Sequence, residues 1–351
     1  MLRTPIYALF SMNRNLRKWL VLLLVLPTWV VYGLQKIPGI PVHIAEVARF
    51  VPYYWLLPLA ILALLLVWAL RMWVAALAVL NLVILLTQTM GVNWNVPLEA
   101  TVSGESIRVL TYNTKVHQLL NRPGGMALLA DEIRFYNADV IALQDADGWL
   151  LDIATTVPTR MPVFLGYPEV YAMGQYIIAS RFPIEGCTAN ALGQNARSRN
   201  YMRCRLSVHG KPLNVVTAHL LSPRYAFLEA RTDPVDGAAN WTANLAERLT
   251  QSQVLAQSMI QLPRPLLVMG DFNAREESPV MEKIMSIGLS DAFSMAGSGW
   301  GFTYGHSIHR HIDFLRIDHI LVSPEFQVTN VRVGESRASD HRAVIADLHL
   351  D

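Results

Sequence analysis

The first ninety residues and the rest of the chain follow different hydrophobic patterns. Three runs near the start lack charged side chains, and they cover residues 19–35, 51–70 and 72–90. A helix needs roughly 17–25 predominantly apolar residues to cross the hydrocarbon core of a bilayer. The runs hold 17, 20 and 19 residues. We therefore expect about three transmembrane helices, in a membrane anchor that covers residues 1–91.

The first run also has the basic front of a cleaved signal peptide. No small-residue cleavage site follows it between Val31 and Lys36, however, and two more apolar runs come directly after. Pro27 lies inside the run, which a membrane helix tolerates. These features favour a retained helix.

Basic residues near the ends of the runs indicate the orientation, because Lys and Arg concentrate in cytoplasmic segments. Four of them precede the first run: Arg3, Arg14, Arg17 and Lys18. Arg71 falls in the next inner turn, whereas Lys36 and Arg49 in the outer loop run partly against the rule. Three crossings place residues 92–351 outside, which in a bacterium is the periplasmic side of the inner membrane. Losing one helix from this count inverts the placement.

Residues 92–105 are polar and contain Pro97 and Gly104, which suits a short linker. From residue 106 to 351 short apolar strands alternate with amphipathic helices, a pattern typical of α/β layers. We expect helices near residues 126–133, 241–262 and 278–288, and loops between residues 221 and 239. The expected strands cover residues 107–114, 140–143, 177–184, 201–208, 213–218, 265–269, 317–322, 326–333 and 343–350.

Charge separates the two regions further. Residues 1–99 carry seven basic and two acidic side chains, which leaves 22 basic and 25 acidic side chains for residues 100–351. The slightly basic total of the chain therefore comes from the anchor. The larger domain lacks the net positive charge expected of a general DNA binder, so nucleic acid is not the favoured partner, although a local basic patch would admit it.

Cys187 and Cys204 are the only two cysteines, and they show no zinc-binding spacing. They would form a disulfide in a domain outside the cytoplasm, provided that their Cα atoms lie within about 7 Å. The alternative is two buried free thiols. The sequence leaves both open.

Polar residues recur where the expected strands end. They are Asn113, Asp145, His219, Asp271, Asn273, Asp318, Asp340 and His341. Carboxylates and amides gathered at one edge of a sheet offer oxygen ligands to a hard cation, Mg²⁺ or Mn²⁺. The two histidines add groups that titrate near neutral pH.

These residues lie in motifs that resemble the endonuclease/exonuclease/phosphatase superfamily, in the family's order and over about residues 106–349. The most specific motif is Gly270-Asp271-Phe272-Asn273. The others are Arg108-Val109-Leu110-Thr111-Tyr112-Asn113, Val140-Ile141-Ala142-Leu143-Gln144-Asp145, Ser180-Arg181-Phe182-Pro183-Ile184, Ala218-His219-Leu220, Arg316-Ile317-Asp318-His319-Ile320 and Ser339-Asp340-His341. The Ala-His-Leu context of His219 resembles the deoxyribonuclease, sphingomyelinase and phosphatase branches.

The resemblance implies a four-layer αββα sandwich of two mixed β-sheets, here preceded by the helical transmembrane region. It also implies a role for each residue. Asn113, Asp145 and Asp340 would bind the metal, and Asp271 would position or deprotonate the attacking water. Asn273 and His219 would donate to phosphoryl or leaving-group oxygens. Asp318 would orient His341.

One position departs from the family pattern, which usually has Glu where this chain has Asp145. Asp is shorter by one methylene, which puts the affinity for the metal in doubt. Asp147 is an alternative ligand, although its place beside Gly148 is typical of an exposed turn acid.

The leading hypothesis is a Mg²⁺-dependent or Mn²⁺-dependent hydrolase of phosphoric esters, a phosphodiesterase or phosphatase, acting at the membrane surface on a lipid-linked substrate. The alternatives are a nuclease on the outer side and, less favoured, a catalytically dead binding module. An arginine cluster is a candidate for holding a substrate phosphate or a lipid headgroup through Arg199 and Arg203. The alternative, which charge patterns of this kind favour, is a solvated loop and strand face. The cluster comprises Arg197, Arg199, Arg203 and Arg205.

Overall fold

The computed structural model describes residues 12–68, 70–95, 105–193, 199–230, 232–305, 312–335 and 337–350. By its internal contacts the chain divides into two units, Met1–Asn93 and Trp94–Asp351. Most of the expected linker and Arg197 lie outside the described residues.

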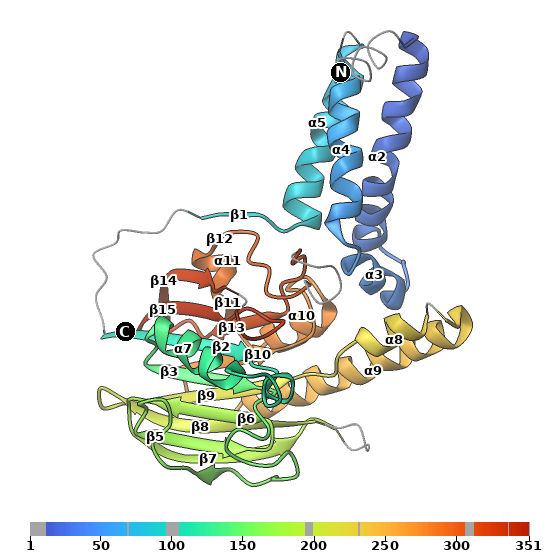
Figure 1. The fold of residues 1–351 in the computed structure, drawn as a ribbon. Helices are drawn as coiled ribbons and strands as arrows, with labels where there is room; N and C mark the ends of the chain where they lie inside the picture. Colours follow the sequence, from blue (N-terminus) through green and yellow to red (C-terminus); the bar gives the residue numbers. More distant parts are fainter. Residues whose placement is uncertain are drawn as a thin grey trace. The chain divides into compact units, whose positions relative to one another are not determined.

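The first unit is helical (Figure 1). Its elements are α2 (Arg14–Lys36), α3 (Val42–Arg49), α4 (Tyr53–Leu66), α5 (Met72–Ile84) and the π-helical turn η1 (Leu85–Thr89). Small and branched apolar residues pack α2 against α4 and α5, among them Val21, Val25, Ala63 and Ala78. Several leucines of these helices face outward, among them Leu16, Leu23, Leu65 and Leu80.

Two of the described helices, α2 and α5 with η1, are long and apolar enough to cross a membrane. A third span results if α3 and α4, which meet at a bend of 72°, count as one. Exposed tryptophans lie near the basic start of α2, where the Lys18 ammonium is 5.3 Å from the Trp19 ring and 5.2 Å from the Trp73 ring. Aromatic and basic side chains gather in this way at membrane–water interfaces.

Two mixed sheets form the centre of the second unit. The seven-stranded sheet has the order β14-β15-β2-β3-β6-β5-β4, and the six-stranded sheet has the order β11-β13-β10-β9-β8-β7. Within them only β2–β3 and β9–β10 are parallel neighbours. The strands of the first are β2 (Glu105–Asn113), β3 (Val140–Gln144), β4 (Thr159–Arg160), β5 (Glu169–Met173), β6 (Tyr176–Ser180), β14 (Phe326–Val333) and β15 (Val344–Leu350). Those of the second are β7 (Ile184–Ala191), β8 (Asn200–Val208), β9 (Lys211–His219), β10 (Leu266–Asp271), β11 (Ser290–Asp291) and β13 (Asp318–Val322).

Side chains that face the other sheet alternate with side chains that face the outer helices along the central strands. This alternation builds the layers of the fold. Ile107 and Val109 of β2 face the other sheet, where they join Val215 and Met269, whereas Leu110 faces outward. Helices cover both outer faces, α7 on the seven-stranded sheet and α9 with α10 on the six-stranded sheet (Figure 1). The helices are α6 (Val116–Leu119), α7 (Gly125–Tyr136), α8 (Arg224–Glu229), α9 (Pro234–Met259), α10 (Pro279–Met285) and α11 (Ala292–Ala296), with short strands β1 (Asn93–Trp94) and β12 (Ser298–Gly299). The predicted α/β fold of two mixed sheets between helices is confirmed.

Two sequence-based expectations were wrong. The single strand expected at residues 177–184 is two strands in different sheets, β6 and β7. Pro183 lies in the crossing between them and cannot donate to a ladder. The segment 221–239, expected as loops, contains α8 and the first turns of α9. Asp233 caps α9 by accepting from Val235 N and Asp236 N, and Pro234 occupies its first turn.

The two cysteines form a disulfide. Cys187 on β7 lies directly opposite Cys204 on β8, with their Cα atoms 4.1 Å apart. The expected Cα separation is thereby confirmed. Pairing of neighbouring strands, which the sequence did not specify, decides between the disulfide and two free thiols.

Candidate active site

Strand ends from both sheets meet at one edge. Parallel pairing brings Asn113 at the end of β2 beside Gln144 at the end of β3, and His219 at the end of β9 beside Asp271 at the end of β10. The antiparallel strand β13 begins there with Asp318, opposite Asp271. Polar side chains therefore converge because strand direction and register bring five strand ends together.

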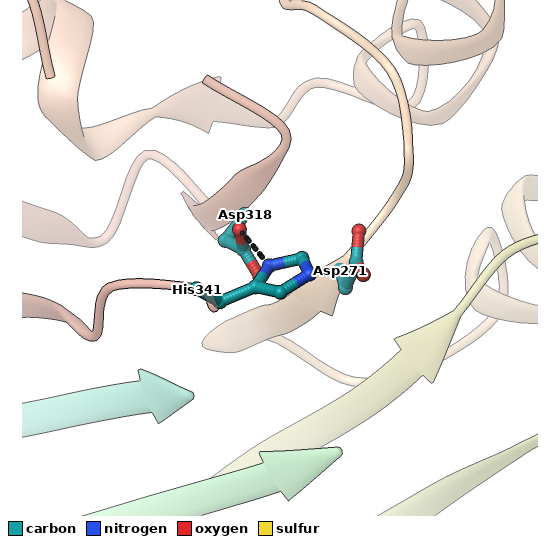
Figure 2. Close-up of side chains that lie close together, drawn as sticks. All are labelled: Asp271, Asp318 and His341. Carbon is teal, nitrogen blue, oxygen red and sulfur yellow. Dashed lines mark hydrogen bonds and ion pairs between the residues drawn. The ribbon is translucent and has the colours of Figure 1, made fainter. Parts of the chain in front are cut away.

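Asp271 is the central carboxylate of this edge and is buried. Its Oδ2 accepts a hydrogen bond from Asn113 Nδ2 at 2.9 Å and lies 3.4 Å from His219 Nε2 and 3.8 Å from His341 Nε2. On its other side the His341 ring donates from Nδ1 to Asp318 Oδ2 at 2.9 Å. Figure 2 shows the His341 ring between the two carboxylates. One carboxylate thus faces two imidazoles, one of which is oriented by a second acid.

The two imidazoles differ in protonation state because their electrostatic surroundings differ. Burial opposes the charge on His341, but the Asp318 and Asp271 carboxylates outweigh it and raise the pKa of this histidine to about 9. Burial also opposes the charge on His219, and there it prevails, so the pKa of His219 is lowered from 6.5. Near neutral pH, His341 is therefore protonated and His219 is neutral.

Asp145 follows β3 in a left-handed backbone conformation, with φ 48°. Its Oδ2 pairs with the Lys115 ammonium, and its Oδ1 lies 3.2 Å from His219 Nδ1. Burial opposes ionisation, but His219 and Lys115 together hold the pKa of Asp145 well below its ordinary value. The sequence interpretation missed Lys115, although its place two residues after Asn113 was a signal.

The Gly-Asp-Phe-Asn turn depends on close backbone approach. A Cβ on Gly270 would lie 2.0 Å from the carbonyl oxygen of Ala218, so only glycine fits between β9 and β10. Asn273 has φ 51°, a conformation that asparagine tolerates. Its backbone N–H donates to Asp271 Oδ1 at 2.9 Å, and its Nδ2 donates to Leu220 O at 3.0 Å. In the structure Asn273 thus fixes Asp271.

Two groups of atoms at this edge can bind a cation. One ligand atom each from Asp271, Asp318 and His341 lies within 4.8 Å of the others, and His341 offers a lone pair to a cation only in its deprotonated form. In addition Asn113 Oδ1 and Asp340 Oδ1 are buried without a hydrogen-bond partner among the described residues. Unpaired buried oxygens are costly unless a ligand, ion or water satisfies them. The donor set consists mainly of oxygens, which fits a hard cation.

The remaining predicted residues lie differently. Arg199 reaches the site, since its Nη1 is 3.5 Å from His219 O. Arg203 on β8 lies directly opposite Val216 on β9, and residues opposite each other point to the same face of the sheet. Val216 faces the outer helices, so Arg203 lies on the opposite face of the sheet from His219. Asp147 lies in the turn after Asp145, and no ion pair of the described residues involves it. Seven of the eight strand-end residues are linked to one another by contacts. The eighth, Asp340, interacts through its negative charge with the Lys115 ammonium.

Buried supporting residues were also missed by the sequence interpretation. Tyr112 donates to Glu132 Oε2 at 3.0 Å, and Ala338 N donates to the same oxygen at 3.1 Å, which holds the segment before Asp340. Arg248 of α9 donates to Asn273 O at 2.6 Å. Glu132 and Arg248 come from helices distant in sequence, so no local motif marks them. Tyr112 directly precedes Asn113 in the β2 motif, but its supporting role was not predicted.

Comparison with known proteins bears on the family and on the fold. The sequence matches the model of the Endonuclease/Exonuclease/phosphatase family over residues 110–341. Among solved structures, it is similar to an endonuclease/exonuclease/phosphatase family protein from Bacteroides thetaiotaomicron, with 18% identity and a TM-score of 0.50 over 71% of this chain and 100% of that one. No curated protein matches the sequence.

Two further structures resemble the chain less well. An endonuclease/exonuclease/phosphatase from Bacteroides vulgatus has 16% identity and a TM-score of 0.49, over 70% of this chain and 100% of that one. D. rerio TDP2, complexed with single strand DNA product, has 14% identity and a TM-score of 0.49, over 70% of this chain and 99% of that one. Identities this low bear on the fold alone. The family model covers more than half of the chain and includes its strand-end motifs, and the chain therefore belongs to the Endonuclease/Exonuclease/phosphatase family.

Proposed function

We propose that this protein is a membrane-anchored, divalent-cation-dependent hydrolase of phosphoric esters. Its family hydrolyses such esters, and the site holds the groups that the chemistry needs. The observation that carries the proposal is the Asp271 carboxylate, which faces two imidazoles, His219 at 3.4 Å and His341 at 3.8 Å. A general base that is hydrogen-bonded and buried in this way can position a water and take its proton.

Each imidazole has a distinct task in this proposal. The protonated His341, held by Asp318, donates a hydrogen bond to a phosphoryl oxygen and stabilises the charge that develops there. His219 Nδ1 faces two acceptors, Gln175 Oε1 at 2.7 Å and Asp145 Oδ1 at 3.2 Å, so Nδ1 carries a hydrogen. An approaching phosphate anion favours protonation of the other ring nitrogen. His219 then donates to the phosphate or to the leaving oxygen.

The residues that would hold the cation are Asn113, Asp145 and Asp340. The unpaired oxygens of Asn113 and Asp340 support this assignment. Mg²⁺ or Mn²⁺ bound there would neutralise charge on the phosphoryl group. Asn273 has a second amide hydrogen, which we assign to a phosphoryl oxygen. Arg199, beside His219, is the candidate for a second phosphate contact.

The anchor supports a substrate at the membrane surface. The apolar helices tie the catalytic unit to the bilayer, and the formal charge of −3 over residues 100–351 disfavours bulk nucleic acid. We therefore propose a lipid-linked phosphoric ester as the substrate. The basic start of α2 and the disulfide favour a periplasmic catalytic unit at the bacterial inner membrane.

The test is hydrolysis by the purified full-length chain in detergent, with Mg²⁺, Mn²⁺ or chelator. The substrates are a generic phosphodiester, a phosphomonoester, plasmid DNA and sphingomyelin. We expect cation-dependent release of phosphate or phosphoester from a non-nucleic substrate. Preferential cleavage of plasmid DNA would favour the nuclease alternative, and inactivity on every substrate would favour a binding module.

The topology has its own test. Alkaline phosphatase fused after residue 100 should be active, because that enzyme requires the periplasm. Fluorescence from a cytoplasmic reporter at the same position, with an inactive phosphatase fusion, would reject the proposed orientation without touching the proposed chemistry.

A further inference from the structure

Lys115 lies inside the acid cluster formed by Asp145, Asp271 and Asp340, rather than at its rim. Its Nζ pairs with Asp145 Oδ2, and only 19% of its side chain is exposed. The carboxylates of Asp145, Asp271 and Asp340 all act on its charge. The Lys115 ammonium thus interacts electrostatically both with residues that we assign to cation binding, Asp145 and Asp340, and with Asp271, which we assign to water activation.

The backbone directs Lys115 to this place. Lys115 has φ 47° and Asp145 has φ 48°, so both residues adopt a left-handed conformation that is unfavourable for side chains with a Cβ. Three hydrogen bonds fix the two segments to each other: Thr114 N to Gln144 O at 2.8 Å, Val116 N to Asp145 O at 2.9 Å and Thr114 Oγ1 to Gln144 O at 2.9 Å. Such conformations persist where the surroundings impose them. The pairing is therefore built into the fold.

Both oxygens of Asp145 are engaged by protein groups, Oδ2 by Lys115 and Oδ1 by His219 at 3.2 Å. Asn113 Oδ1 and Asp340 Oδ1, in contrast, have no hydrogen-bond partner in the part of the chain that the structure describes. The site therefore contains free oxygens and one carboxylate that is already neutralised. A divalent cation that takes Asp145 as a ligand must compete with an ammonium group of the same chain.

We propose that Lys115 is a built-in counter-ion of this cluster, which holds Asp145 in the cation-free protein and is displaced from it when a divalent cation binds. The inference rests on the proposed function, because it assumes that Asp145 belongs to the cation site. It explains how a chain with a short aspartate at this position keeps several buried carboxylates together without an ion. Uncompensated carboxylates would repel one another.

The test is calorimetric titration of Mn²⁺ into the full-length protein in detergent, after removal of cations with chelator. Lys115→Met should bind Mn²⁺ about tenfold more tightly than the parent, which corresponds to about 1.4 kcal/mol. Lys115→Arg retains the charge and should bind like the parent. Lys211→Met removes an exposed lysine at the start of β9 and should change nothing. In chelator, Lys115→Met should melt about 5 °C below the parent, because its carboxylates lack a counter-ion.

A second measurement needs no variant. Acetylation of Lys115 by an amine-reactive reagent, followed by mass spectrometry, should be faster with saturating Mn²⁺ than with chelator, while acetylation of Lys211 should not change. This readout decides the question if Lys115→Met does not fold.

The outcomes are distinguishable. Equal or weaker Mn²⁺ binding by Lys115→Met, or acetylation of Lys115 that Mn²⁺ does not accelerate, overturns the displacement and leaves the phosphoesterase proposal intact. If the parent and Lys115→Met both fail to bind Mn²⁺, both the displacement and the cation dependence are wrong.

Discussion

Two buried Asp–His pairs each include one residue of strand β13. They differ in whether the polar atoms around them are satisfied by hydrogen bonds. Asp318 pairs with His341 at the strand ends, whereas the next residue, His319, pairs with Asp291 at 2.5 Å on the other face of the sheet. Neighbouring residues of a strand point to opposite faces. The same two residue types, one step apart, therefore enter two different environments.

The His319 pair is fully satisfied. His319 Nε2 donates to Ala274 O at 2.9 Å, Asp291 accepts from Phe293 N at 2.8 Å and Ser294 N at 3.1 Å, and Arg316 completes the cluster with Nη1 2.9 Å from Asp291 Oδ2. Around His341, in contrast, oxygens of Asn113 and Asp340 find no hydrogen-bond partner among the residues that the structure describes. Saturated hydrogen bonding indicates a structural pair, and unused polar atoms indicate a pair that serves a ligand.

The largest expected effect breaks the functional pair. His341→Ala removes the protonated imidazole and its pairing with Asp318, so hydrolysis should fall by about 10²–10⁴-fold, the usual contribution of such a group. The melting temperature should fall as well, because the buried Asp318 loses its donor, but the loss of rate in the folded fraction should be the dominant effect. Steady-state rates with a soluble phosphodiester measure the first effect, and a thermal melt measures the second. A variant as active as the parent would make the assignment of this site wrong.

The structural pair should respond in the opposite way. His319→Ala leaves a carboxylate oxygen of Asp291 and the Ala274 carbonyl without their hydrogen-bond donor, and it opens a cavity. We expect the free energy of unfolding to fall by about 2–4 kcal/mol. The catalytic unit should then melt roughly 5–15 °C lower, while kcat of the folded fraction drops far less than in His341→Ala. His117→Ala, on the exposed surface of α6, is the matched control. A catalytic loss as large as that of His341→Ala, without a stability loss, would contradict the distinction.

A smaller effect concerns acid. Burial opposes ionisation of Asp291, but Arg316 and His319 outweigh it and hold the pKa of Asp291 well below its ordinary value of 3.8. A depressed pKa stabilises the fold above the unfolded value, and that stability is lost as the pH falls through the folded value. The difference in melting temperature between the parent and Asp291→Asn should therefore be constant from pH 7 to about 5 and shrink below about pH 4. Melts across this range test it, and a difference that grows in acid would contradict the assigned direction.

The elements with strong local signals were predictable, and those that depend on distant partners were not. Central strands such as β3 and β10 begin as continuous apolar runs, so their positions and the α/β class followed from the pattern. The split at Pro183 was not predicted, because an apolar run does not state which sheet each half joins. The helical α8 was not predicted either. Its Phe227 ring lies 4.4 Å from the Trp241 ring of α9, a contact between segments that the local pattern does not specify.

The sequence by itself determined the apolar segments of the first ninety residues, the family and the set of strand-end residues, because each depends on residue type and order along the chain. Only the tertiary structure decided that Cys187 lies opposite Cys204, that Arg203 faces away from His219, and that Lys115 enters the acid cluster. These outcomes depend on register, on the face of a strand and on two left-handed backbone conformations. Those quantities are fixed by contacts between segments far apart in sequence, and local residue patterns do not encode them.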